Sequence, residues 1–75
     1  MPERSPWEDK AANLLKAELK RRGVTYAQLV DRLDAIGVSE SERNIRNKVS
    51  RGKFTAAFLL QCLEAIDAHD VRIAA

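Results

Sequence analysis

The residues best suited to bind a charged ligand lie in one short stretch, residues 43–53. This stretch carries five basic side chains and no acidic one, whereas residues 23–42 carry a net charge of −3. A solvent-facing helix usually mixes charges of both signs, so a segment of one sign is typical of a surface that faces phosphate groups. The plainer interpretation is a solvated helix face that keeps the protein soluble.

The same stretch places side chains that can read bases on one side of a helix. With Ile45 and Val49 facing inward, a helical wheel directs Arg43 and Asn47 outward, with Asn44 beside them. Arg and Asn form paired hydrogen bonds with guanine and adenine edges in the major groove. We therefore expect base contacts from Arg43, Asn44 and Asn47. Phosphate contacts are expected from four other polar and basic side chains: Lys48, Ser50, Arg51 and Lys53. Arg46 and Arg22 are secondary candidates for phosphate contacts.

No combination of residues predicts catalysis, a metal site or a cofactor. One cysteine and one histidine do not make a zinc site, and the sequence lacks a Gly-rich phosphate loop and a nucleophile–base arrangement. Cys62 lies on an apolar stripe and is expected to be a core residue. We therefore do not expect an enzyme.

The composition fits one small helical domain, residues 1–75. Hydrophobic residues make up 45% and charged residues 32%, and only three Gly and two Pro interrupt the chain. No apolar run approaches the roughly 20 residues that span a bilayer, and the first ten residues lack the apolar centre of a signal peptide. The sequence therefore predicts an all-α, cytoplasmic protein with no membrane segment.

Capping signals and apolar periodicity divide the chain into four helices, at about residues 6–22, 26–36, 40–51 and 56–67. The expected N-caps are Ser5, Thr25, Ser39 and Thr55. Trp7 is expected to cover the core as a lid on the first helix, and Ile36 to lie in the buried stripe of the second. Residues 68–75 are expected to form a short extended tail after this core of about residues 6–67.

The stretch from Leu15 to Ile66 resembles the lambda-repressor-like helix-turn-helix domains of the Cro and repressor type. The matching positions are spread over the expected helices and their turns: Leu19–Thr25, Leu29, Leu33, Gly37–Ser39, Ile45, Arg51–Thr55 and Leu59–Ile66. Residues 47–58 are also similar to a group of short uncharacterised bacterial proteins of that fold. The resemblance implies a compact four-helix domain whose helix over residues 40–51 enters the major groove of double-stranded DNA, and a role as a small transcriptional regulator.

Three features depart from the pattern of that family. Tyr26 occupies the position where the family usually has a phosphate-binding Gln, and Val30 stands where a smaller Ala is usual. The spacing from Tyr26 to Ile45 is several residues longer than in the compact motif. Two other functions stay open: a protein-interaction module that uses the same fold without binding DNA, and an RNA-binding module.

A second copy of the chain is the other expected partner. Leu60 lies about 120° from the centre of the buried face of its helix on the wheel. Val71 and Ile73 alternate with Arg72 in the tail, where they either pair with the tail of a second copy or close the core of the monomer. Regulators of this type usually gain affinity by pairing, so we expect a homodimer.

Overall fold

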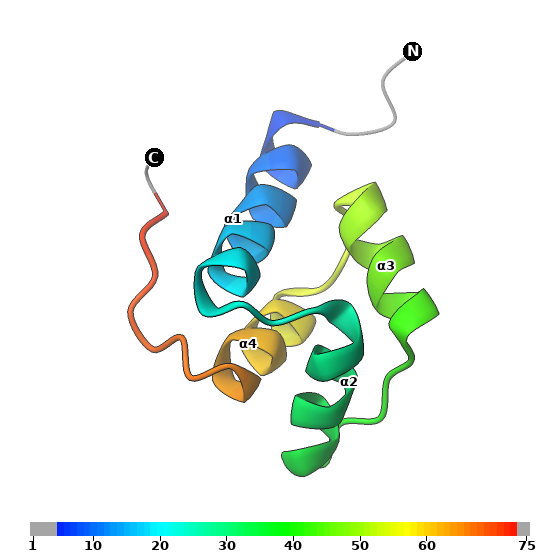
Figure 1. Ribbon diagram of the computed structural model, residues 1–75. Helices are drawn as coiled ribbons and strands as arrows, with labels where there is room; N and C mark the ends of the chain where they lie inside the picture. The colour runs from blue at the N-terminus through cyan, green and yellow to red at the C-terminus, as the bar shows by residue number, and fades with distance from the viewer. Residues whose placement is uncertain (1–4, 74–75) are drawn as a thin grey trace.

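The computed structural model describes residues 5–73, and this part of the chain contains four α-helices and no strand (Figure 1). The helices are α1 (Pro6–Arg22), α2 (Tyr26–Ala35), α3 (Glu42–Arg51) and α4 (Ala56–Ala65). Both α3 and α4 pack against both α1 and α2. The predicted all-α, four-helix architecture is therefore confirmed.

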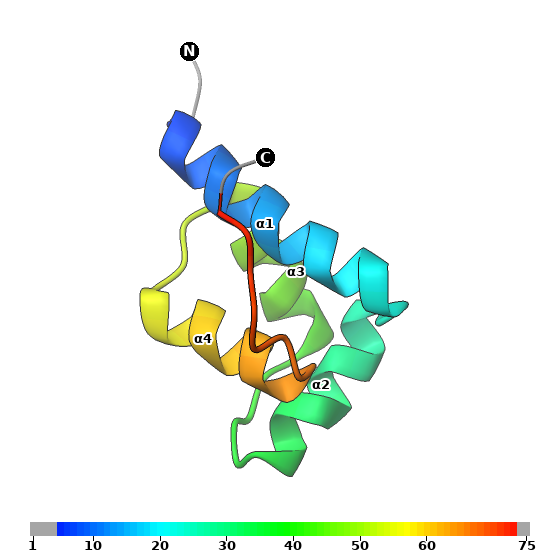
Figure 2. The ribbon, with the colours of Figure 1, turned by 90° about the vertical axis from the view of Figure 1, so that its left-hand side faces the viewer.

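The chain after α4 returns across the molecule as an irregular segment. In Figure 2, this segment crosses α4 and then α1, with α3 behind them. Figure 1 shows the same arrangement from the side, with the C-terminal segment and α3 on opposite sides of the molecule. Residues 68–73 of the predicted tail form no strand, and residues 74–75 lie outside the described range. Ala68 is buried and Val71 is half-buried, so the first part of this segment completes the core.

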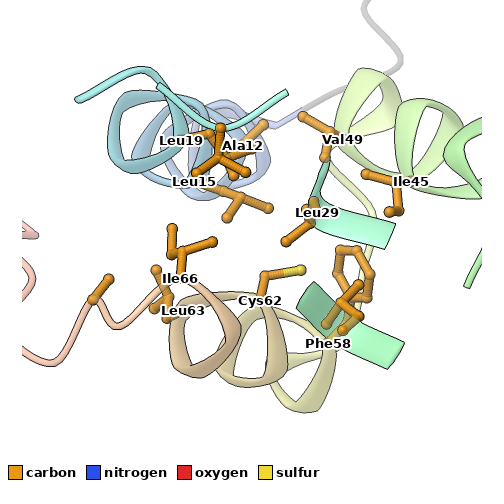
Figure 3. Packing of buried hydrophobic residues seen from close by; sticks show 13 residues of the cluster. Ala12, Leu15, Leu19, Leu29, Ile45, Val49, Phe58, Cys62, Leu63 and Ile66 are labelled. Atoms are coloured by element: carbon orange, nitrogen blue, oxygen red, sulfur yellow. The ribbon is translucent and has the colours of Figure 1, made fainter. Parts of the chain in front are cut away.

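One hydrophobic core lies between the four helices (Figure 3). Its members come from every helix, from the turn between α1 and α2 and from the turn after α4: Ala12, Leu15, Leu19, Val24, Leu29, Leu33, Ile45, Val49, Phe58, Cys62, Leu63, Ile66 and Ala68. Cys62 points from α4 into this core, as predicted, and burial raises the pKa of its thiol to about 12. The thiol therefore stays protonated and acts as a small apolar side chain.

Side-chain caps fix the starts of the helices. Ser5, Thr25 and Thr55 are the N-caps of α1, α2 and α4, as predicted. At α1, the Ser5 hydroxyl accepts a hydrogen bond from the Glu8 amide at 3.1 Å, and a Glu8 carboxylate oxygen accepts one from the Ser5 amide at 2.7 Å. Such reciprocal bonds satisfy two amide groups that the helix itself leaves without partners.

The predicted start of α3 was wrong by two residues, because the N-cap is Ser41 and not Ser39. The Ser41 hydroxyl accepts a hydrogen bond from the Asn44 amide at 3.1 Å. Glu40 lies outside the helix and forms an ion pair with Lys48 at 2.7 Å. Within one helix, residues 40 and 48 would be separated by about 12 Å along the axis. Glu40 reaches Lys48 because it lies outside the helix, so this contact agrees with a helix that begins at residue 42 and not at residue 40.

The two serines before α3 provide a matched test of this cap. We expect Ser41→Ala to lower the free energy of unfolding by about 1 kcal/mol, because the Asn44 amide loses its acceptor. Ser39→Ala also removes a serine hydroxyl, but from an exposed position outside the helix, and should change the free energy of unfolding by less than about 0.5 kcal/mol. Urea denaturation of both variants measures the difference, and equal effects would contradict the assignment of Ser41 as the cap.

Two apolar residues expected in the core lie outside it. Trp7 is 76% exposed, because it lies in the first turn of α1 and lines a surface groove instead of covering the core. Ile36 is 44% exposed. It follows the last residue of α2, so the helical wheel no longer describes the direction of its side chain.

The sequence interpretation also missed a buried carboxylate. Glu18 is only 3% exposed on α1. Its carboxylate forms an ion pair with Arg22, one helical turn later, and a second one with Arg21 at 3.5 Å. A buried charge is expensive unless it is paired, and both partners lie in the last turn of the same helix.

Candidate nucleic-acid interface

The core anchors α3 through two side chains on one face. Ile45 and Val49 are spaced by four residues, and both are 0% exposed. The helix packs on α1 and α2, and at its C-terminal end Gly52 adopts the left-handed conformation with φ 69°. The Gly52 amide donates to the Lys48 carbonyl at 3.0 Å, so the end of the helix is also closed. Apart from the half-buried Lys48, all other residues of α3 are exposed.

The face of α3 opposite these anchors is polar and exposed. Arg43 and Asn47 lie one turn apart on it, followed by Ser50, and all three side chains are exposed. Asn44 and Arg51 flank them and are exposed as well. Neither Arg43 nor Arg51 forms an ion pair with any other residue within 5–73. These guanidinium groups are therefore positioned to meet an external anion.

Four other basic residues predicted to bind phosphate are held in ion pairs within the chain. Each joins a carboxylate of its own helix or of a neighbouring segment: Arg22 joins Glu18, Arg46 joins Glu42, Lys48 joins Glu40 and Lys53 joins Glu8. The Arg46 pair, at 2.6 Å, is solvent-exposed, and its guanidinium group lies 5.9 Å from the centre of the Tyr26 ring. Exposed pairs of this kind contribute little stability, so an external phosphate can compete for such a cation.

Lys53, in the turn between α3 and α4, forms an ion pair with the first turn of α1. Its ammonium group lies 2.8 Å from the Glu8 carboxylate, across 45 residues of sequence. Glu8 uses its other carboxylate oxygen to complete the cap of α1. The hydrogen bond from Lys53, together with that from the Ser5 amide, lowers the pKa of Glu8. The turn between α3 and α4 is thereby tied to the start of α1.

Lys48 is directed toward the protein and not toward the outer face of α3. Its ammonium group lies 4.4 Å from the centre of the Phe58 ring on α4 and 2.7 Å from the Glu40 carboxylate. The Lys48 ammonium holds the pKa of Glu40 below its usual value, with a smaller contribution from Asn44. Glu40 in turn adds to the raised pKa of Cys62. Lys48 therefore joins the segment before α3 to α4 and has a structural role.

Because Glu40 is paired with Lys48, we expect the loss of its charge to change the free energy of unfolding by an amount that depends on pH. The pKa of Glu40 is lowered from 4.5 in the folded state, so the pair stabilises the fold above about pH 4.5 and this contribution is lost as the pH falls through the lowered pKa. Glu40→Gln should therefore cost about 1 kcal/mol at pH 7 and much less near pH 3. Urea denaturation at both pH values measures this change.

Glu42→Gln is the matched control for that experiment, because the pair of Glu42 with Arg46 is exposed on both sides. We expect this variant to change the free energy of unfolding by less than about 0.5 kcal/mol at pH 7. A Glu40→Gln effect of the same size at both pH values would contradict a role for the charge of Glu40.

Neither a metal centre nor a membrane span is present in the part of the chain that the structure describes. Within residues 5–73, no three His, Cys, Asp or Glu side chains are grouped so that they could hold a metal ion. No helix in the same range has both the length and the apolar character needed to cross a bilayer.

Comparison with known proteins places most of the chain in one family. Residues 7–71 match the model of a family described as a domain of unknown function (DUF6471). No curated protein and no solved structure matches the chain. The matched range includes all of α2, α3 and α4, and with them the candidate interface.

Proposed function

This chain belongs to the DUF6471 family, and we propose that it is a cytoplasmic DNA-binding module of the lambda-repressor-like helix-turn-helix type, acting as a small transcriptional regulator. In this proposal α2 and α3 form the motif, and α3 enters the major groove. One observation carries the proposal: α3 is anchored by two fully buried residues, Ile45 and Val49, and presents exposed Arg43 and Asn47 on its opposite face. Recognition in the major groove needs this combination of a fixed helix and an exposed polar face.

The residues of α3 take different roles in this proposal. Arg43, Asn44 and Asn47 contact base edges, since Arg suits guanine and Asn suits adenine. Arg51 and Ser50 contact phosphates from the last turn of the helix. These contacts fix both the sequence preference and the register of the module on the duplex.

The paired basic residues contribute in a second way. Arg46 and Lys53 are more than half exposed, so each can exchange its carboxylate partner for a phosphate. Lys48 is less exposed and lies against Phe58, so we assign it to the positioning of α3 and not to direct binding. Arg22 is paired with buried Glu18 on α1 and is the weakest of the phosphate candidates.

Fluorescence anisotropy with labelled duplex DNA, single-stranded DNA and duplex RNA tests the proposal. We expect the duplex DNA to bind most tightly, with an affinity that falls as salt is raised, by about 0.9 log units per log unit of salt for each phosphate contact. Absence of duplex binding at about 50 mM salt would reject the proposal. Tighter binding to single strands or to RNA would favour the RNA-binding alternative instead.

A further inference from the structure

An apolar groove lies between α1, α4 and the C-terminal segment. It encloses about 380 Å³, and its walls include Leu14, Leu59, Leu63 and Val71. Three large apolar side chains line it while remaining mostly exposed: Trp7 is 76%, Leu60 64% and Ile73 70% exposed. Large apolar side chains that gather in this way on a small domain mark an interaction site. The elements that line the groove, α1, α4 and the C-terminal segment, face the viewer in Figure 2, with α3 behind them.

The charges around this groove differ between its two ends. Lys10 on α1 lines the groove, and Lys10 and Arg72 both line the adjoining pocket beside α1. At the other end, Glu64 in the last turn of α4 lines a pocket that shares Leu60 and Val71 with the groove. The exposed Asp67 lies two residues after the end of α4. The face is therefore basic at the α1 end and acidic at the α4 end.

We propose that this groove binds a second copy of the same chain in an antiparallel, two-fold symmetric pair. A two-fold axis in the interface, at right angles to the line between the two ends, brings the basic end of each copy against the acidic end of the other. A nucleic acid, or any partner with charges of one sign only, would complement the charge of only one end of the groove. The inference does not depend on DNA binding, because α3 takes no part in it.

The shape of the groove fits the same partner. Two-fold symmetry requires one surface patch to supply both the protruding and the receiving groups. Trp7 protrudes at the α1 end with its ring beside the Lys10 ammonium group, at 5.8 Å. Leu60, on α4, protrudes from the opposite wall of the groove. Each copy thus offers large apolar side chains, together with a groove that receives those of the other copy. Large side chains that fill a pocket on the partner are the interface residues that contribute most to affinity.

Sedimentation equilibrium of the full chain, without nucleic acid, tests the pair. Over a range from about 5 μM to about 1 mM we expect a reversible monomer–dimer equilibrium. Leu60→Glu should raise the dimer dissociation constant by about tenfold or more, because each copy loses an apolar contact and gains a buried charge. Ile36→Glu is the matched control, since Ile36 is also exposed but does not line the groove, and it should leave the equilibrium unchanged.

A charge exchange tests the antiparallel arrangement. Lys10→Glu and Glu64→Lys should each weaken the homodimer, because two like-charged pairs then face each other. An equimolar mixture of these two variants should form a heterodimer at least as tight as the wild-type dimer, since both contacts regain opposite charges. A wild-type chain that stays monomeric over the whole range would overturn the proposal. A mixture that associates no more tightly than either variant alone would overturn the antiparallel pairing.

Discussion

Ile45→Ala is expected to lower the free energy of unfolding by about 2–5 kcal/mol. Ile45 is 0% exposed and is one of only two residues of α3 that are buried. Truncation leaves a cavity where α3 meets the core, and the helix has a single remaining anchor in Val49. Urea denaturation followed by circular dichroism measures the loss. For a domain of this size, each kcal/mol lowers Tm by about 4–8 °C.

Asn47→Ala is the control for this substitution, because it truncates a side chain on the exposed face of the same helix. Its effect should stay within about 0.5 kcal/mol. A loss below about 0.5 kcal/mol for Ile45→Ala would show that α3 is not held by the core. The proposed recognition helix would then lack the fixed position that reading of bases requires.

The second large effect is expected in DNA binding, on a preferred site selected from random duplexes. Arg43→Ala and Asn47→Ala should each cost about 1–3 kcal/mol on that site and little on random DNA, because a lost base contact is specific. Lys53→Ala should weaken binding to both DNAs by similar factors and reduce the salt slope by about one, as expected for a lost phosphate contact. Anisotropy titrations over a salt series measure both quantities.

Arg72→Ala provides the matched control, because it also removes one exposed positive charge but belongs to the C-terminal segment, which lies on the opposite side of the molecule from α3 in Figure 1. It should leave the affinity for both DNAs nearly unchanged. If Arg43→Ala and Asn47→Ala bind the selected duplex as tightly as the wild type, α3 does not read bases. A protein-interaction module would then be the better proposal for the function of this domain.

Local signals were sufficient to predict most of the architecture. Each helix start at Ser5, Thr25 and Thr55 has a hydroxyl followed by an apolar stripe, so the cap and the periodicity agree. Before α3 two serines compete, Ser39 and Ser41. The choice between them depends on the contact of Glu40 with Lys48 and on the docking of the helix, which are tertiary features. A local pattern does not distinguish the two serines.

The charged partners of the candidate site were the least predictable part. Lys53 and Glu8 are 45 residues apart, and their contact arises only because α1 packs beside α3 and α4. The position of Lys48 over Phe58 likewise depends on how α3 and α4 are each packed on α1 and α2. A helical wheel separates inward from outward residues, but it does not show which outward cation meets a carboxylate. In contrast, Glu42 and Arg46 are four residues apart on one helix, and that spacing was visible in the sequence.

The apolar groove is lined by α1, α4 and the C-terminal segment, and this segment lies on the opposite side of the molecule from α3. This placement restricts what a paired form of the protein can do. A dimer joined through the groove carries its two α3 helices on its outer surfaces, facing apart. Recognition of an inverted repeat requires both helices on one side of a single duplex, about 34 Å apart. The proposed pair would instead hold two separate DNA segments at once, as a cross-link between distant sites or between the two arms of a loop.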